Sequence, residues 1–184
     1  MIMKKLLLIL ALLLPMLVKA QWVVTPNGVL VDSITGKDYS IIQREGTAAD
    51  LYGSILKNVH RIFVRPADVV STIENEMISV RGYGETSLKY GGIKQYLRPL
   101  ISVKIEFKDN RMRVSGNWVS SLSGNSLSGA PNETDPYTLF VKGGWKCFDK
   151  NGAVKNEKRY KIYNSVVNQF INDILTTTTE EDDW

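Results

Sequence analysis

The side chains best suited to chemistry in this chain are a single histidine, a single cysteine and a set of carboxylates. His60 and Cys147 would form a nucleophilic pair only if the fold brought them together, and neither lies in a local motif typical of such pairs. Two residues also fall short of the ligand set that a zinc site needs. The sequence therefore argues against cysteine catalysis and structural zinc, and we expect no cofactor.

Carboxylates offer a second route to catalysis, because a glycosidase needs only two of them. Glu74, Glu76 and Glu85 are candidates, but the chain holds 19 acidic residues, and these three lie at or beside a predicted turn. Solvated turn charge is the simpler interpretation. A hydrolase of envelope or glycan polymers stays open as the alternative function.

Glycines and aromatic residues suggest two binding sites that the sequence does not favour. Gly82-Tyr83-Gly84 lacks the helix start that a phosphate-binding loop requires after its glycines, so a strand kink or the close approach of a helix explains it better. Aromatic residues could build a platform for sugars, although most aromatic residues in small domains belong to the core. The members of that set are Trp22, Trp118, Trp145, Tyr83, Tyr90 and Tyr96.

The amino terminus has the three parts of an export signal. Lys4 and Lys5 precede an apolar run, Leu6–Val18, and small residues precede a cleavage site between Ala20 and Gln21. The run is shorter than the roughly 20 residues that a spanning helix needs. We expect a cleaved signal peptide, a periplasmic or extracellular protein, and no stable membrane span after cleavage.

Cleavage changes the charge of the chain. Three of the 23 lysines and arginines (Lys4, Lys5 and Lys19) leave with the signal, so 20 remain against 19 acidic residues. A nucleic-acid partner calls for a concentrated basic surface, which this average does not indicate. The remaining 164 of the 184 residues suffice for a single domain.

Two amphipathic helices are predicted. Thr47 and Asp50 form a capping-box pattern at the start of the first helix, which Pro66 is expected to end. The second helix begins near Lys158. Its apolar stripe, typical of a helix that packs on a sheet, comprises Ile162, Tyr163, Val166, Val167, Phe170, Ile171, Ile174 and Leu175, with Asn164, Ser165, Asn168, Gln169, Asn172 and Asp173 opposite.

Strands are predicted around the first helix. Residues 37–43 form one, and Val69–Glu74 and Met77–Tyr83 form a hairpin in which a two-residue turn, Asn75-Glu76, places Ile73 opposite Ile78.

A second hairpin turns at Asp109-Asn110, residue types that tolerate the left-handed backbone of such turns. This register sorts the residues into an apolar face and a polar face, and a shift by one residue would lose the sorting. The apolar pairs are Phe107 with Met112, Ile105 with Val114, Val103 with Gly116, and Ile101 with Trp118. The polar pairs are Lys108 with Arg111, Glu106 with Arg113, Lys104 with Ser115, and Ser102 with Asn117.

The polar face of this hairpin is the candidate partner surface. It carries Lys104, Glu106, Arg111 and Arg113, to which we add Trp145 from the segment that follows. A protein, peptide or glycan of the cell envelope is the expected partner.

The predicted organisation of the chain is one α+β domain with short additions at both ends. Residues 1–20 form the signal peptide, 21–36 an arm or strand, 37–175 the domain with an insert at 120–156, and 176–184 an acidic tail. Ser120–Pro136 is rich in serine, glycine and proline, which predicts a surface loop. Beyond it, Tyr137–Val141 and Trp145–Phe148 are predicted to be extended.

The order of elements resembles a family of exported bacterial proteins, common in Gram-negative gut bacteria. The resemblance rests on the capped helix at 47–51, on the strand at 77–84 and on the alternating pair around Asp109-Asn110. The family is a domain of unknown function with a TATA-binding-protein-like fold. It implies a curved antiparallel sheet with two helices on one face and no assigned activity; the insert at 120–156 departs from its pattern. A non-enzymatic binding module is therefore the favoured function.

The export signal generates a direct prediction. When the full chain is expressed in a Gram-negative host, the recovered protein should begin at Gln21, which its intact mass and amino-terminal sequence will show. A protein that retains residues 1–20 in the membrane fraction would contradict the prediction.

Overall fold

The computed structural model describes residues 21–90, 93–123, 132–134 and 146–176. Its helices are α2 (Ala48–Ile62), α3 (Glu157–Leu175) and the short 3₁₀ helix η1 (Pro66–Asp68). Its strands are β1 (Trp22–Val24), β2 (Leu30–Asp32), β3 (Tyr39–Gln43), β4 (Val70–Ile73), β5 (Met77–Tyr83), β6 (Thr86–Tyr90), β7 (Ile93–Leu97), β8 (Pro99–Lys108), β9 (Arg111–Ser123) and β10 (Asn132–Thr134).

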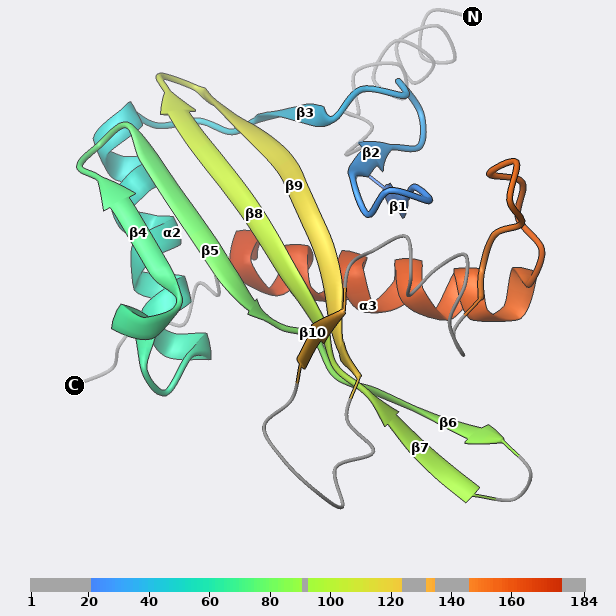
Figure 1. Ribbon diagram of the computed structural model, residues 1–184. Coiled ribbons are helices and arrows are strands. Elements are labelled where there is room, and N and C mark those ends of the chain that lie inside the picture. Colours follow the sequence, from blue (N-terminus) through green and yellow to red (C-terminus); the bar gives the residue numbers. More distant parts are fainter. Residues whose placement is uncertain (1–20, 91–92, 124–131, 135–145, 177–184) are drawn as a thin grey trace, which may run out of the picture.

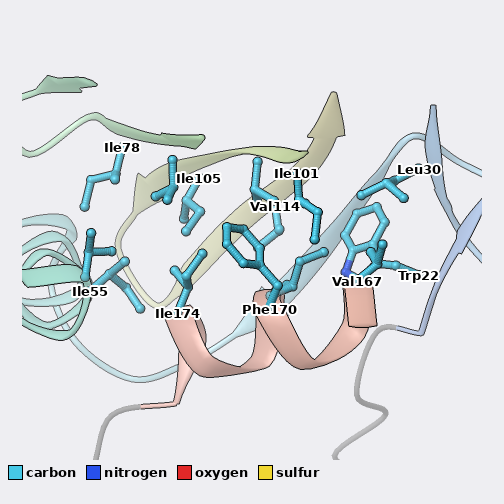
Figure 2. Packing of buried hydrophobic residues seen from close by; sticks show 14 of the residues in the cluster. Trp22, Leu30, Ile55, Ile78, Ile101, Ile105, Val114, Val167, Phe170 and Ile174 are labelled. Atoms are coloured by element: carbon cyan, nitrogen blue, oxygen red, sulfur yellow. The ribbon is translucent and has the colours of Figure 1, made fainter. Parts of the chain in front are cut away.

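The main sheet has six antiparallel strands, confirming the predicted α+β class. Its order is β10-β9-β8-β5-β4, and β3 pairs with β9 outside that path. The helices α2 and α3 lie on the same side of the sheet (Figure 1). Side chains of α3 such as Val167, Phe170 and Ile174 point toward Ile101 and Ile105 of β8 (Figure 2). The hydrophobic core therefore lies between one side of the sheet and the two helices.

The hairpin β8–β9 confirms most of the predicted register. Asn110 has a φ of 60°, and the pairs from Lys108/Arg111 to Val103/Gly116 are as expected. Beyond Gly116 the prediction is wrong, because Asn117 is an extra residue in a β-bulge. Trp118 consequently lies opposite Ser102, and Val119 takes the position opposite Ile101. The pairing with Ile101 that was expected to place Trp118 on the core face is therefore absent.

Leu30 of β2 lies directly against β9 beside the bulge. A methyl group added to Gly116 would overlap the side chain of Leu30, which is fully buried. Only glycine leaves room for the hairpin β1–β2 to pack this closely on β9. The glycine next to the bulge therefore packs against a residue more than 80 positions earlier in the sequence.

Local interactions fix α2 where the sequence predicts. Thr47 and Asp50 form the capping box: the hydroxyl of Thr47 accepts from the backbone N–H of Asp50 at 3.1 Å. The Asp109-Asn110 turn also holds this helix start, because the N–H of Ala48 donates to the Asp109 carboxylate at 2.9 Å. The helix ends at Ile62, earlier than predicted, and Pro66 opens η1.

The hairpin β4–β5 differs from the prediction by one residue. Ile73 pairs with Met77, so Thr72 and not Ile73 lies opposite Ile78. The turn contains one more residue than expected, and Asn75 within it adopts the left-handed conformation at φ 58°. A second element was missed: the sequence analysis predicts no strands between Thr86 and Leu97, where the hairpin β6–β7 forms.

The insert also contains more structure than expected. Ser120–Ser123 belongs to β9, and β10 pairs with that end of the strand, so Ser120–Pro136 is not a loop throughout. The predicted strand Tyr137–Val141 lies outside the described residues. Phe148 is buried and forms an isolated bridge with Val154.

Two asparagine side chains of α3 bind the backbone of β1. Asn168 accepts from the N–H of Trp22 at 2.8 Å and donates to its carbonyl at 2.7 Å, and Asn164 accepts from the N–H of Val24 at 3.0 Å. These two asparagines were predicted to lie opposite the apolar stripe, and there they supply the hydrogen bonds that a neighbouring strand would give β1. The hairpin β1–β2 is thereby fixed to the core.

Buried Asn58 of α2 donates hydrogen bonds to the carboxyl end of α3. Its side-chain amide donates to the carbonyls of Asp173 and Ile174 at 2.6 and 2.7 Å, and Arg44 donates to the carbonyl of Leu175 at 3.1 Å. The last carbonyls of a helix lack partners within the helix, so these bonds remove a cost of burying them. Both helices are therefore locked to each other as well as to the sheet.

The close approach of Leu30 to Gly116 yields a prediction about stability. Gly116→Ala should lower the free energy of unfolding by about 1–3 kcal/mol, because the new methyl group forces β2 away from β9. Gly53→Ala is the matched control: nothing lies within 4 Å of its added methyl group, and α2 should gain about 0.5–1 kcal/mol. Urea denaturation measures both.

A second variant separates overlap from loss of glycine flexibility. Adding Leu30→Ala to Gly116→Ala should make the Gly116→Ala step cost less than it does beside Leu30. An equal cost in both backgrounds would contradict the packing explanation.

Candidate binding face of the sheet

The side of the sheet opposite the helices is the candidate functional site. The register brings residues of β3, β9, β8 and β5 onto this open face in rows. One row runs Ile41, Arg113, Glu106, Met77, and the next runs Tyr39, Ser115, Lys104, Ser79. The charged residues at these and adjoining positions are Arg81, Lys104, Lys108, Arg111 and Arg113, with Glu106 as the single acid among them.

Glu106 lies at the centre of the charges. Its carboxylate accepts from Nε of Arg113 at 2.6 Å, and its other oxygen lies 3.6 Å from Nζ of Lys104. All three side chains are partly exposed, so this network contributes little stability. The pairing with Glu106 holds the Arg113 side chain in place, and its single carboxylate neutralises only part of the positive charge of the face.

The aromatic ring of Tyr39 lies near two cations on this face. The Lys37 ammonium lies 5.3 Å from the centre of its ring, and the Arg113 guanidinium lies 5.9 Å from it. Next to it, Ile41 exposes 45% of its surface. The open face therefore combines positive charge with aromatic and aliphatic surface.

A shallow hollow of about 400 Å³ lies on this face. It is lined by Ile41, Glu106, Phe107, Lys108, Arg111 and Arg113. The hollow is open to solvent, which suits a side chain of a partner better than an enclosed small molecule.

The structure thus brings together four of the five predicted surface residues. Lys104, Glu106, Arg111 and Arg113 share the open face, whereas Trp145 lies outside the described residues. The sequence missed Tyr39, Ile41 and Arg81, because they reach this face only through the pairing of β3 with β9 and of β5 with β8. The alternation of Tyr39 and Ile41 is visible in the sequence, but the strand that they pair with is not.

The residues considered for cysteine chemistry have opposite environments. His60 is exposed on α2, and Cys147 is buried. Burial raises the pKa of the Cys147 thiol to about 12, although the charge of Arg159 opposes the shift. The thiol is therefore protonated at neutral pH and a poor nucleophile. Within the described part of the chain, histidine, cysteine and acidic residues form no group of three that could hold a metal.

The candidate carboxylates are exposed, including Glu74 and Glu76 beside the β4–β5 turn. Glu85 pairs with Arg98 at 2.9 Å and lines a separate hollow of about 360 Å³. Asp173, a carboxylate that the sequence did not single out, lines the same hollow and accepts from Gln169 at 2.6 Å. Glu85 and Asp173 therefore share one recess.

Gly82, Gly84 and Trp22 serve packing. Methyl groups added to Gly82 and Gly84 would come within 2.9 Å of Phe63 and 2.5 Å of Val166, so both glycines mark a close approach of the helix side, as predicted. Trp22 is buried. Tyr83 exposes 41% of its surface beside Arg98. The side chains of Trp118, Tyr90, Tyr96 and Trp145 lie outside the described structure.

No protein-family model matches the sequence, and no curated protein matches it. Two solved structures match the fold, each with a TM-score of 0.50 over 74% of this chain. One is a TBP-like protein from Parabacteroides distasonis, 11% identical, of which 85% is covered. The other is a DUF4468 family protein from Bacteroides ovatus, 10% identical, of which 79% is covered. At this identity the likeness shows the fold, and the fold is the TATA-binding-protein-like one that the sequence resemblance implies.

Proposed function

We propose that this chain is an exported, non-enzymatic binding module whose open sheet face takes an acidic segment of a protein in the cell envelope. The observation that carries the proposal is the charge of that face: four basic residues, Lys104, Lys108, Arg111 and Arg113, stand around Glu106, on the side of the sheet that neither helix covers. A surface of one dominant sign attracts partners of the opposite sign.

The mixture of side chains supports a protein partner over nucleic acid. A surface that binds a phosphate backbone is much more positive than a protein interface, and a carboxylate at its centre would repel phosphates. Here Glu106 is central, and Tyr39, Ile41 and Met77 add aromatic and apolar surface. Arginine, tyrosine and methionine are enriched in protein interfaces. A carboxylate of the partner can pair with Lys108 or Arg111 while an apolar side chain enters the hollow.

The export signal expected from the sequence favours an envelope location for the partner, and an anionic glycan is an outcome that the experiment distinguishes. The alternative function is a hydrolase of envelope or glycan polymers, and the hollow with Glu85 and Asp173 is where it would act. Both carboxylates are exposed, and Glu85 is paired with Arg98. A binding role is the better fit to such a surface.

Charge reversal on the open face tests the proposal. The probe is a fluorescent peptide of alternating glutamate and valine residues, and its binding to the processed chain is followed by anisotropy at low salt. Lys108→Glu with Arg111→Glu should weaken binding about tenfold or more, because the variant reverses the sign where the peptide docks. The two changed residues face each other in the hairpin, so a like-charged pair stays a like-charged pair and the fold is preserved.

Lys150→Glu with Lys155→Glu is the matched control, since it changes the net charge equally at exposed residues that precede α3. It should leave peptide binding within about twofold, because it lies away from the open face. An equal loss in both variants would refute a site on the sheet. Tighter binding of duplex DNA or of a polyanionic glycan than of the peptide would refute the protein partner.

A further inference from the structure

The strand β3 forms an edge of the main sheet. It pairs with β9 on one side, and none of the described strands pairs with it on the other. Two hydrogen bonds continue the register beyond the ends of the strand. The N–H of Gly116 donates to the carbonyl of Asp38 at 3.3 Å. The N–H of Arg44 donates to the carbonyl of Asn110 at 3.1 Å. In an antiparallel pair such bonded positions recur at every second residue, so these two bonds fix the pattern between them.

This alternation decides which backbone groups of β3 point away from β9. Ser40 and Ile42 bond to β9, whereas the N–H and C=O groups of Tyr39, Ile41 and Gln43 point to the free edge. These outward groups form no hydrogen bond within the part of the chain that the structure describes. The edge is therefore a row of three donors and three acceptors that can pair with another strand.

The sequence of β3 does not protect this edge. Exposed edge strands commonly carry lysine, proline or a bulge that keeps other strands away. The residues of β3 are Tyr-Ser-Ile-Ile-Gln, its register with β9 is unbroken, and Ile41 exposes 45% of its surface.

The strand at the opposite edge of the sheet, β4, offers less. The N–H of Arg81 donates to the carbonyl of Val69, which fixes the alternation along β4. Within this strand, Val70 and Thr72 are therefore the residues that point their backbone groups outward. β3 has the longer row of outward groups, and it borders the hollow of the open face through Ile41.

We propose that the acidic segment binds by adding an extended strand to the free edge of β3. This inference rests on the proposed function and specifies the form of the partner, an extended segment that pairs over the five residues of β3. In strand addition, main-chain hydrogen bonds supply affinity and alternate side chains supply specificity. One set of its side chains lies on the open face. The other set lies beside Ile42, which packs against the core, so an alternation of acidic and apolar residues fits both sides.

The charges beside the edge favour an acidic segment over a second copy of β3. On β9, Arg113 lies opposite Ile41, and Arg111 lies opposite Gln43. A second copy that paired antiparallel about Ile41 would place its own Arg113 three strand spacings from this one, about 14 Å away. Like charges would then face each other across the new pair. A carboxylate on an acidic strand meets the same arginines as the opposite charge.

Backbone methylation of the peptide of alternating glutamate and valine tests strand addition. One peptide carries N-methyl groups on its glutamates and a second carries them on its valines. Directly opposed residues of an antiparallel pair share a side of the sheet, so the residues that bond to the edge have their side chains on the open face, where charge selects glutamate. N-methylation of the glutamates should weaken binding about tenfold or more, because it removes N–H donors and adds bulk at the contact. N-methylation of the valines should leave binding within about threefold, because those N–H groups point to solvent.

Gln43→Pro makes the matching change in the protein. It removes an N–H that points to the free edge and no bond to β9, and proline is tolerated where an edge N–H faces solvent. The variant should keep the circular dichroism of the parent and bind the unmodified peptide about five- to tenfold more weakly. Thr72→Pro is the matched control, because it removes an outward N–H at the opposite edge, on β4. It should leave peptide binding within about twofold. The methylated peptides test the unaltered protein, so the proposal stays open to refutation if a proline variant does not fold.

Equal binding of the two methylated peptides, or equal effects of Gln43→Pro and Thr72→Pro, would overturn strand addition. If Lys108→Glu with Arg111→Glu still weakens binding in that case, the proposed function stands and only its binding mode is wrong. A loss confined to the peptide methylated on valine would support the same edge with a parallel strand, in which the bonded residues lie on the other side. No binding of the unmodified peptide would overturn both proposals. A dimer in sedimentation velocity that Gln43→Pro removes, without peptide binding, would assign the edge to a second copy.

Discussion

The constraint on which the structure depends is that the apolar side of β5, β8 and β9 must be covered, and that two helices and the β1–β2 hairpin share the task. Ile78, Ile105 and Val114 are fully buried on this side. Because alternate residues of a strand point to opposite sides, covering one side commits the neighbouring residues to the other. The open face, with its cluster of basic residues, is thus a direct consequence of how the core is built.

The helix α3 is the element that closes this core. Its apolar stripe packs on the sheet, and its asparagines bind the backbone of β1. Its last carbonyls accept hydrogen bonds from the side-chain amide of Asn58. The described chain contains no helix long and apolar enough to cross a membrane. Trp22, close to the expected cleavage site, is both buried and hydrogen-bonded to Asn168, so the start of β1 belongs to the packed body.

Local patterns in the sequence were sufficient to predict the parts that depend on near neighbours. The capping box of Thr47 and the alternation on both sides of Asn110 identified α2 and most of β8–β9 correctly. Nothing in the residues near Asn117 indicates the bulge, and the open-face positions of Ile41 and Arg81 depend on strand pairings distant in the sequence. The hairpin β6–β7 was missed because Gly84 and Gly91-Gly92, which are typical of turns, lie on both sides of a short alternating segment.

The division of the sheet into a covered side and an open side is the central claim, and labelling of adjacent residues tests it most directly. Cysteines placed singly at Lys104 and Ile105, in a Cys147→Ala background, would be reacted with a maleimide under native conditions. The structure predicts that the cysteine at 104 reacts at about the rate of an exposed thiol and that the one at 105 reacts about a thousandfold more slowly, because it must wait for the core to open. Equal rates at the two positions would contradict the account.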